Sequence, residues 1–248
     1  MEKVIVITGA SRGIGAATAQ LAAARGYAVC VNYLKNQAAA NALVADIEAA
    51  GGQAIAVAAD VASETEVVNL FKAVDQRLGT LTALVNNVGI LETQMRVDAM
   101  DAARLNRIFA ANVTSCFLCA REAVRRMSVR HGGSGGAIVN VSSAAARLGA
   151  AGEYVDYAAS KGAIDTFTIG LAREVATEGI RVNAVRPGFI YTGIHASGGE
   201  PGRVDRVKDS VPMKRGGRPE EVATAILWLL SDEASYATGS FIDLAGGR

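Results

Sequence analysis

The chain has few of the residues that build metal sites and hydrolytic triads. Its 248 residues include two histidines, His131 and His195, and three cysteines, Cys30, Cys116 and Cys119. Two histidines leave almost no material for a histidine-based zinc site or a serine–histidine–aspartate triad. The Cys116/Cys119 pair lies inside a helical pattern with no second pair, so we interpret both as core residues. We therefore expect no metal site, and so little cysteine is typical of a reducing compartment.

Long apolar runs and an excess of charge of one sign are also missing. No apolar stretch approaches the length of a membrane span, and no signal peptide precedes the first expected strand, so we expect a cytoplasmic protein without membrane contact. The net charge is +1, with acids and bases interspersed, which argues against nucleic acid as a partner. Four arginines gather near the end of an expected helix, and a solvated helix face is a plainer interpretation than a binding patch. They are Arg121, Arg125, Arg126 and Arg130.

Short β-branched runs alternate with alanine-rich helical patterns along the chain. The expected strands are residues 4–7, 28–32, 54–58, 83–85, 137–141, 181–185 and 241–244. The expected helices are residues 13–25, 37–50, 64–78, 101–130, 154–177 and 219–230, with a capping box at Ser63–Glu66 and a proline opening at Pro219. This alternation predicts an α/β fold with a doubly wound parallel sheet of about seven strands and helices on both faces. No linker divides the chain, so we expect a single domain over residues 1–248.

Residues 189–217 break this regularity, because they are rich in glycine and polar residues and have no strong periodicity. A flexible substrate loop is the functional interpretation, and a merely exposed loop is the alternative.

A glycine turn connects the first expected strand to the first expected helix. It reads Thr8-Gly9-Ala10-Ser11-Arg12-Gly13-Ile14-Gly15, a G-x-x-x-G-x-G spacing. The start of a helix offers unpaired N–H groups and a positive dipole end, which suit a phosphate. Gly9 can adopt a turn conformation closed to other residues, and the later glycines allow close approach of a pyrophosphate and a neighbouring strand. Alone, the turn is equally compatible with packing.

Two further patterns carry acid–base chemistry. Tyr157 and Lys161 lie four residues apart in a helical pattern, hence on one face, where an ammonium would lower the phenol pKa towards the range needed for proton transfer. Ser142 and Ser143 end an expected buried strand, where a hydroxyl could bind a substrate oxygen or simply close a turn.

The order of these motifs resembles the short-chain dehydrogenase/reductase family. The glycine turn, Asn86-Asn87-Val88-Gly89, Asn112, Ser143, the Tyr157/Lys161 pair and Pro187-Gly188 follow one another as they do in the subgroup with T-G-x-x-x-G-x-G and Y-x-x-x-K motifs. The resemblance runs from the first strand to the closing Asp243-Leu244-Ala245-Gly246-Gly247. It implies a Rossmann-type fold and hydride transfer between a nicotinamide and a carbonyl carbon.

The resemblance also implies a role for each matching residue. Tyr157 would exchange a proton with the substrate oxygen, Ser143 would position that oxygen, Lys161 would hold the nicotinamide ribose and lower the tyrosine pKa, and Asn112 would support a relay water. Ser142 is the weaker of the two serine candidates. The expected cofactor residues are Gly9, Ser11, Arg12, Gly13, Ile14, Gly15, Asn32, Tyr33, Lys35, Asp60, Val61, Asn86, Asn87, Gly89, Tyr157, Lys161, Pro187, Gly188, Ile190 and Thr192.

Two positions depart from the family pattern. Val88 replaces the usual alanine of N-N-A-G, which we expect to change packing more than chemistry. Ser143 and Tyr157 are fourteen positions apart, one more than the commoner spacing, and we place the extra residue in the loop at 147–153. Tyr154 has no lysine four residues on and is the poorer proton donor.

The second strand favours NADP over NAD. An NAD site would place an acid after this strand, whereas the chain reads Val31-Asn32-Tyr33-Leu34-Lys35. Arg12 and Lys35 could both approach a 2′-phosphate, and two solvated cations are the alternative. NADP is our prediction, with NAD use left open.

The sequence thus predicts an NADP-dependent oxidoreductase for a ketone or secondary alcohol. It resembles 3-oxoacyl-carrier-protein reductases and glucose dehydrogenases equally, so an NAD-linked sugar dehydrogenase stays an alternative. A catalytically silent NAD(P)-binding regulator and an epimerase or dehydratase are weaker alternatives. We expect residues 91–96, 144–154 and 189–217 to form the pocket for a small-molecule substrate. Their composition does not identify that substrate. Relatives imply a homo-tetramer or homo-dimer through the long helices and the C-terminal segment.

Overall fold

Strand residues alternate between two apolar layers, and this alternation explains the architecture. In the first strand Val4 and Val6 pack into one cluster of buried residues, and Ile5 and Ile7 pack into another. Successive strand side chains point to opposite faces, so each face of the sheet is covered by helices. The computed structural model describes residues 3–248.

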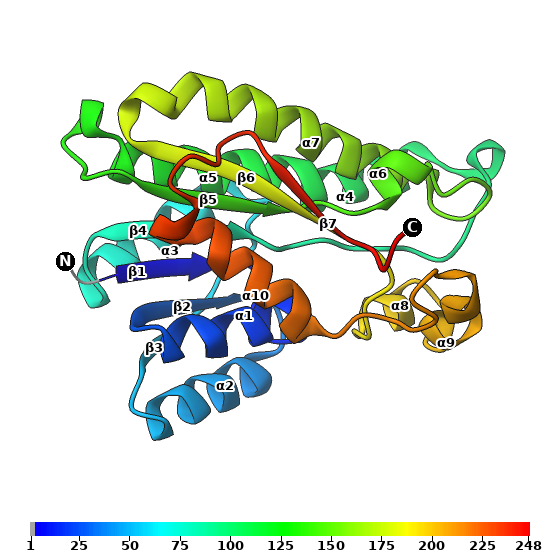
Figure 1. Cartoon of the computed structure of the whole chain (residues 1–248), viewed down its shortest axis with the longest axis horizontal. Helices are drawn as coiled ribbons and strands as arrows, with labels where there is room; N and C mark the ends of the chain where they lie inside the picture. The colour runs from blue at the N-terminus through cyan, green and yellow to red at the C-terminus, as the bar shows by residue number, and fades with distance from the viewer. Residues whose placement is uncertain (1–2) are drawn as a thin grey trace.

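The sheet has seven parallel strands in the order β3-β2-β1-β4-β5-β6-β7 (Figure 1). The strands are β1 (Lys3–Ile7), β2 (Tyr27–Tyr33), β3 (Gln53–Ala58), β4 (Leu81–Asn86), β5 (Gly136–Val141), β6 (Ile180–Pro187) and β7 (Phe241–Leu244). Every expected strand is present, and the doubly wound Rossmann-type sheet is confirmed. The order reverses between β1 and β4, where such sheets form a crevice at the carboxyl ends of their strands.

Helices α1, α2 and α10 cover one face, and α3, α5 and α7 cover the other (Figure 1). The helices are α1 (Gly13–Ala24), α2 (Gln37–Ala49), α3 (Glu64–Arg77), α4 (Ala102–Phe109), α5 (Ser115–Met127), α6 (Ala145–Leu148), α7 (Val155–Val175), α8 (Ile194–Ser197), α9 (Arg203–Val207) and α10 (Pro219–Leu230). No helix within residues 3–248 is long and apolar enough to cross a membrane.

The single helix expected over residues 101–130 is wrong in detail. A π-helical segment (Ala110–Thr114) separates α4 from α5, and a short 3-10 turn (Val129–His131) follows them. Asn112 lies in the π segment, and its amide both accepts from Ile90 N at 2.8 Å and donates to Ile90 O at 3.2 Å. The local change of pitch therefore accompanies a pair of hydrogen bonds to a distant loop, which helical periodicity does not reveal.

Two smaller expectations also differ. Ser63 precedes α3 without capping it by its side chain. Glu66 instead accepts a hydrogen bond from Asp60 N at 2.7 Å, so the expected capping box is wrong. Residues 189–217 contain more helix than their composition indicated, namely α8, α9 and a 3-10 turn (Lys208–Ser210).

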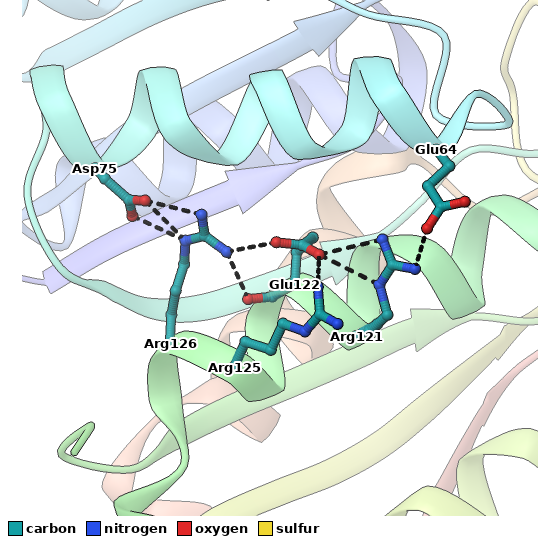
Figure 2. Close-up of polar contacts among 6 residues, drawn as sticks. All are labelled: Glu64, Asp75, Arg121, Glu122, Arg125 and Arg126. Atoms are coloured by element: carbon teal, nitrogen blue, oxygen red, sulfur yellow. Dashed lines mark hydrogen bonds and ion pairs between the residues drawn. The ribbon is translucent and has the colours of Figure 1, made fainter. Parts of the chain in front are cut away.

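The arginines of α5 form a compensated network with acids of α5 and α3 (Figure 2). Glu122 is buried, with 4% of its surface exposed, and accepts from Arg125 Nη1 at 2.9 Å and Arg126 Nη1 at 2.8 Å. Arg121 also pairs with Glu122 and with Glu64, and Arg126 pairs with Asp75. Three arginines thus meet three carboxylates. This favours a paired helix face over the alternative of a basic binding patch.

Candidate active site

A cavity of about 800 Å³ lies at the carboxyl ends of the strands. Most of the residues that the sequence singled out line it: Gly9, Ser11, Arg12, Gly13, Ile14, Tyr33, Lys35, Asn87, Gly89, Ser143, Tyr157, Lys161, Pro187, Gly188, Ile190 and Thr192. The other expected residues are not part of this lining: Gly15, Asn32, Asp60, Val61, Asn86 and Asn112. The three segments expected to form the substrate pocket all contribute, through residues such as Leu91, Ala151 and Ile194.

The glycine turn has the shape of a phosphate cradle. Gly9 has a φ of +60°, and a Cβ there would lie 3.0 Å from Val88 Cγ2. A Cβ on Gly15 would lie 2.7 Å from Asn87 Nδ2, which is closer than real contacts allow. Within residues 3–248 no side chain caps α1, and its first turn holds no acid, so its N–H groups and positive dipole end suit an anion. The residues present therefore fit a dinucleotide pyrophosphate.

Polar side chains behind the cavity hold this turn in place. Asn32 Oδ1 accepts from Gly9 N at 3.1 Å, and its Nδ2 donates to Ala59 O at 3.1 Å. Thr8 Oγ1 accepts from Asn87 N at 2.9 Å, while Asn87 Nδ2 donates to Thr8 O at 2.9 Å. Asn32 thus ties three strand ends together. Thr8 was not among the expected site residues, although its place at the start of the glycine motif was a usable signal.

Asn86 has a similar supporting position. It is buried between β4 and β5, where its Nδ2 donates to Asn140 Oδ1 at 2.9 Å. Asn140 in turn donates to Thr168 Oγ1 at 2.9 Å. This chain of amides links two strands to α7 and leaves the Asn86 side chain turned to the interior.

Two cations stand at the end of the cavity nearest β2. Arg12 and Lys35 both line it, and neither makes a salt bridge within residues 3–248. Their neighbour Asn32 carries no charge. This end of the cavity is therefore electropositive and suits a phosphate better than a bare ribose hydroxyl.

Tyr157 and Ser143 both line the part of the cavity that is formed by α7 and the end of β5. Ser143 Oγ accepts from Ala145 N at 3.1 Å, which fixes its side chain at the strand end. Burial raises the pKa of the Tyr157 phenol, and the Ser143 hydroxyl partly opposes this rise. The phenol is therefore protonated at neutral pH, as a proton donor to a carbonyl oxygen must be.

Lys161 lies one turn further along α7. Its Nζ donates to Val141 O at 2.7 Å and stands 5.7 Å from the centroid of the Tyr157 ring. A Cβ on Gly89 would lie 3.2 Å from that Nζ, so the glycine leaves room for the ammonium. Burial lowers the pKa of Lys161 to about 8, against the negative charge of Asp165. The lowering of the tyrosine pKa by Lys161 stays a prediction.

Asn112 contributes through its neighbours. It is buried, and besides its two bonds to Ile90 it donates to Ser160 Oγ at 3.0 Å. It thereby fixes the loop after β4 against α7, next to Lys161. The relay water expected beside it stays a prediction.

The substrate end of the cavity has a wall centred on Arg203, which was not among the expected site residues. Arg203 of α9 lies with its guanidinium 5.0 Å from the Tyr154 ring centroid and 5.6 Å from that of Phe189. It pairs with Glu200 at 2.9 Å and, more closely, with Glu153. Arg206 pairs with the same two acids, so two arginines meet two carboxylates from two loops. Glu153 lies fifty residues before Arg203 in the sequence, so no local pattern announced that contact.

His195 completes this wall as a neutral residue. It is buried, its Nε2 lies 3.1 Å from Ile190 O, and burial lowers its pKa. Tyr154 donates to Gly198 O at 3.2 Å, so it packs as part of the wall. The loop before it contains Ala150 with a φ of +48° between Gly149 and Gly152, which also have positive φ. This is the segment in which we place the extra residue.

The buried ammonium of Lys161 should make stability depend on pH in a defined window. Its pKa is about 8 in the folded chain and ordinarily 10.5, so between these values the unfolded chain binds more protons and stability rises with pH. At about 1.4 kcal/mol per unit, the wild-type free energy of unfolding should rise by about 3 kcal/mol across the window relative to Lys161→Met. Urea denaturation of both proteins at the two ends of the window measures this. A difference that does not change with pH would contradict it.

Comparisons with known proteins agree with this geometry. A family model described as enoyl-(acyl carrier protein) reductase matches residues 9–248. An uncharacterised oxidoreductase of Escherichia coli K12, YgfF, is 64% identical over 99% of both chains. A 3-oxoacyl-[acyl-carrier-protein] reductase of Synechocystis is 39% identical over 99% of this chain and 96% of its own.

Solved structures give the same result. The crystal structure of a short-chain dehydrogenase from Burkholderia cenocepacia in complex with NADP matches with a TM-score of 0.91 and 32% identity. The match covers 100% of this chain and 98% of that one. Sequence and structure together therefore establish an NAD(P)-dependent oxidoreductase that belongs to the short-chain dehydrogenase/reductase family.

Proposed function

We propose that the chain interconverts a ketone and a secondary alcohol with NADP, and that Tyr157 is its general acid and base. The observation that carries this proposal is the convergence of Tyr157, Ser143 and Lys161 on the cavity that also contains the glycine cradle. A silent cofactor-binding protein would not require that convergence. An NAD-linked sugar dehydrogenase is the alternative that differs in both cofactor and substrate.

The residues divide the chemistry among them. The glycine turn, Arg12 and Lys35 would hold NADPH, which when bound would supply a hydride for the carbonyl carbon. Tyr157 gives its phenolic proton to the carbonyl oxygen, and the Ser143 hydroxyl donates a hydrogen bond to the same oxygen as charge develops there. Lys161 places a positive charge beside the phenol, which favours loss of the proton. Asn112 holds the Ile90 loop that borders these groups.

Charge supports NADP as the preferred cofactor. Arg12 and Lys35 would bind the 2′-phosphate, and Asn32 offers no carboxylate to a ribose hydroxyl. The solved relative from Burkholderia is itself a complex with NADP.

The substrate end combines paired charges with apolar side chains that suit the acyl part of a substrate. Glu153 and Glu200 pair with Arg203 and Arg206, and His195 is neutral. The remaining wall includes Leu91, Leu148 and Arg248, whose guanidinium lies 4.9 Å from the Phe189 ring centroid. Contact with apolar side chains favours binding of a substrate with apolar surface, whereas burial of sugar hydroxyls there would cost free energy. We therefore rank 3-oxo esters and thioesters above glucose as substrates.

Replacing the proposed proton donor tests the function. In the wild-type enzyme, NADPH oxidation should be fastest with acetoacetyl-CoA or ethyl 3-oxobutanoate among a panel that includes cyclohexanone, with glucose tested in the oxidative direction. Tyr157→Phe should lower kcat by about a thousandfold or more, because it removes the acid, while NADPH still binds. Tyr236→Phe, at a fully exposed tyrosine, is the matched control and should keep wild-type turnover. Wild-type turnover in Tyr157→Phe refutes the assignment, and conversion without added cofactor would indicate the epimerase alternative.

Removing the two cations tests the cofactor preference. Arg12→Ala and Lys35→Ala should each raise the KM for NADPH by about tenfold, the loss of one charge-assisted contact, and leave the KM for NADH nearly unchanged. Arg96→Ala, at an exposed arginine outside the cavity, should change neither. A higher kcat/KM for NADH than for NADPH in the wild type would overturn the preference.

The outer helices point to a homo-oligomer. Phe109 and Phe117 are 38% and 48% exposed on α4 and α5, and Ile169 is 37% exposed on α7. Phe117 stacks on Phe167 with ring centroids 3.9 Å apart, so the apolar surface bridges two helices. Light scattering should give two or four times the chain mass of 25.6 kDa, and Phe117→Glu should lower it. A monomeric wild type would contradict this.

A further inference from the structure

Ser142, the serine without a role in the proposed function, is hydrogen-bonded to α7. Its hydroxyl donates to Asp165 Oδ1 at 2.6 Å, close to Lys161 O at 3.2 Å, and the residue is 2% exposed. Both serines line the cavity, but the Ser143 hydroxyl makes no contact with α7: it accepts from Ala145 N at 3.1 Å and donates to Pro187 O at 3.5 Å. Ser142 is therefore bound to α7, and only Ser143 has a hydroxyl available to a substrate oxygen in the proposed function.

Asp165 is itself held from a second strand. It lies one turn beyond Lys161 on α7, and its Oδ2 accepts from Arg186 Nε at 2.9 Å and Nη2 at 2.9 Å. The side chains of Asp165 and Arg186 are 13% and 16% exposed, so the pair is largely removed from water. Arg186 directly precedes Pro187 and Gly188, which line the cavity.

The contacts continue outward to the helix that follows Ser143. Arg186 Nη1 lies 3.7 Å from Asp243 Oδ1 of β7, and its guanidinium stacks on Phe241 at 3.9 Å. Asp243 also pairs closely with Arg147 of α6. Because α6 begins two residues after Ser143, the contacts return to the loop from which they started.

We propose that Ser142, Asp165, Arg186, Asp243 and Arg147 form a charge ladder that positions Ser143 against Tyr157 and Lys161. Ser143 lies between two anchors of the ladder, Ser142 directly before it and Arg147 four residues after it. The ladder meets α7 at Asp165, four residues after Lys161 and eight after Tyr157, so it ties the strand end that carries Ser143 to the helix that carries the tyrosine. This inference rests on the proposed function, and its five members are positioning residues because none touches the reacting atoms.

Turnover of ladder variants tests the proposal, with NADPH and whichever panel compound the wild type reduces fastest. Ser142→Ala and Asp165→Ala should each lower kcat by about 10- to 100-fold, since misplacing a catalytic group by about 1 Å has an effect of this size. The KM for NADPH should stay within about twofold, because the glycine cradle is untouched. Asp165→Asn keeps an oxygen that accepts from Ser142 and should retain most of the kcat that Asp165→Ala loses.

Coupling between the two positions separates positioning from general damage. The double variant Ser142→Ala/Asp165→Ala should be no slower than the slower single variant, because both changes break the same contact. A crystal structure of Asp165→Ala should show Ser143 Oγ displaced relative to Tyr157. Additive losses, or an undisplaced Ser143 with wild-type kcat, would overturn the proposal.

Glu122→Gln is the matched control. Glu122 is also a buried carboxylate that holds arginines, but it lies on α5 away from the cavity. The Glu122→Gln substitution should lower the free energy of unfolding, while kcat of the folded enzyme stays at the wild-type value. Equal kcat losses in Glu122→Gln and Asp165→Ala would reduce the ladder to a general structural role. If Tyr157→Phe is inactive but Asp165→Ala is not impaired, the ladder fails and the proposed function stands.

Discussion

The close docking of α7 on the end of β5 governs the rest of this site. Lys161 Nζ on the helix donates to Val141 O of the strand at 2.7 Å, and the Ser142 hydroxyl at the strand end donates to Asp165 Oδ1 of the helix at 2.6 Å. Each element therefore donates a hydrogen bond to the other. Tyr157, Lys161 and Asp165 follow at intervals of four and share one face. The same contact that packs the helix therefore sets the distance between proton donor and substrate-binding serine.

That docking has an electrostatic consequence. An ammonium is buried beside a phenol, and burial acts against its charge. The hydrogen bond from Lys161 Nζ to Val141 O and the apolar packing of the sheet and helices offset this unfavourable burial. Burial of the Lys161 ammonium thus lowers conformational stability, whereas the proposed proton transfer requires that ammonium beside the phenol. Such a conflict is common where an enzyme shifts the pKa of a catalytic group.

Much of the fold could be predicted because it depends on local alternation. Seven apolar runs and the helices between them follow directly from periodicity and propensity. The errors lie where a distant residue decides local geometry. The break between α4 and α5 depends on Ile90 meeting Asn112, and the cap of α3 was misassigned because Glu66 bonds Asp60. The candidate site shows the same division. Its motifs placed Tyr157 and Ser143 correctly on the cavity, but they could not separate residues that line it from those behind it, such as Asn32.

The wall around Arg203 has a consequence for altering substrate scope. Its guanidinium is shared by carboxylates from two loops and two aromatic rings, so these loops are linked energetically as well as spatially. A library that varies Arg203 alone would remove the partner that Glu153 and Glu200 share, and the resulting loss of stability would oppose any gain in selectivity. Evolution of a new specificity here is therefore expected to proceed by paired replacements, in which the acid of one loop and the base of the other change together.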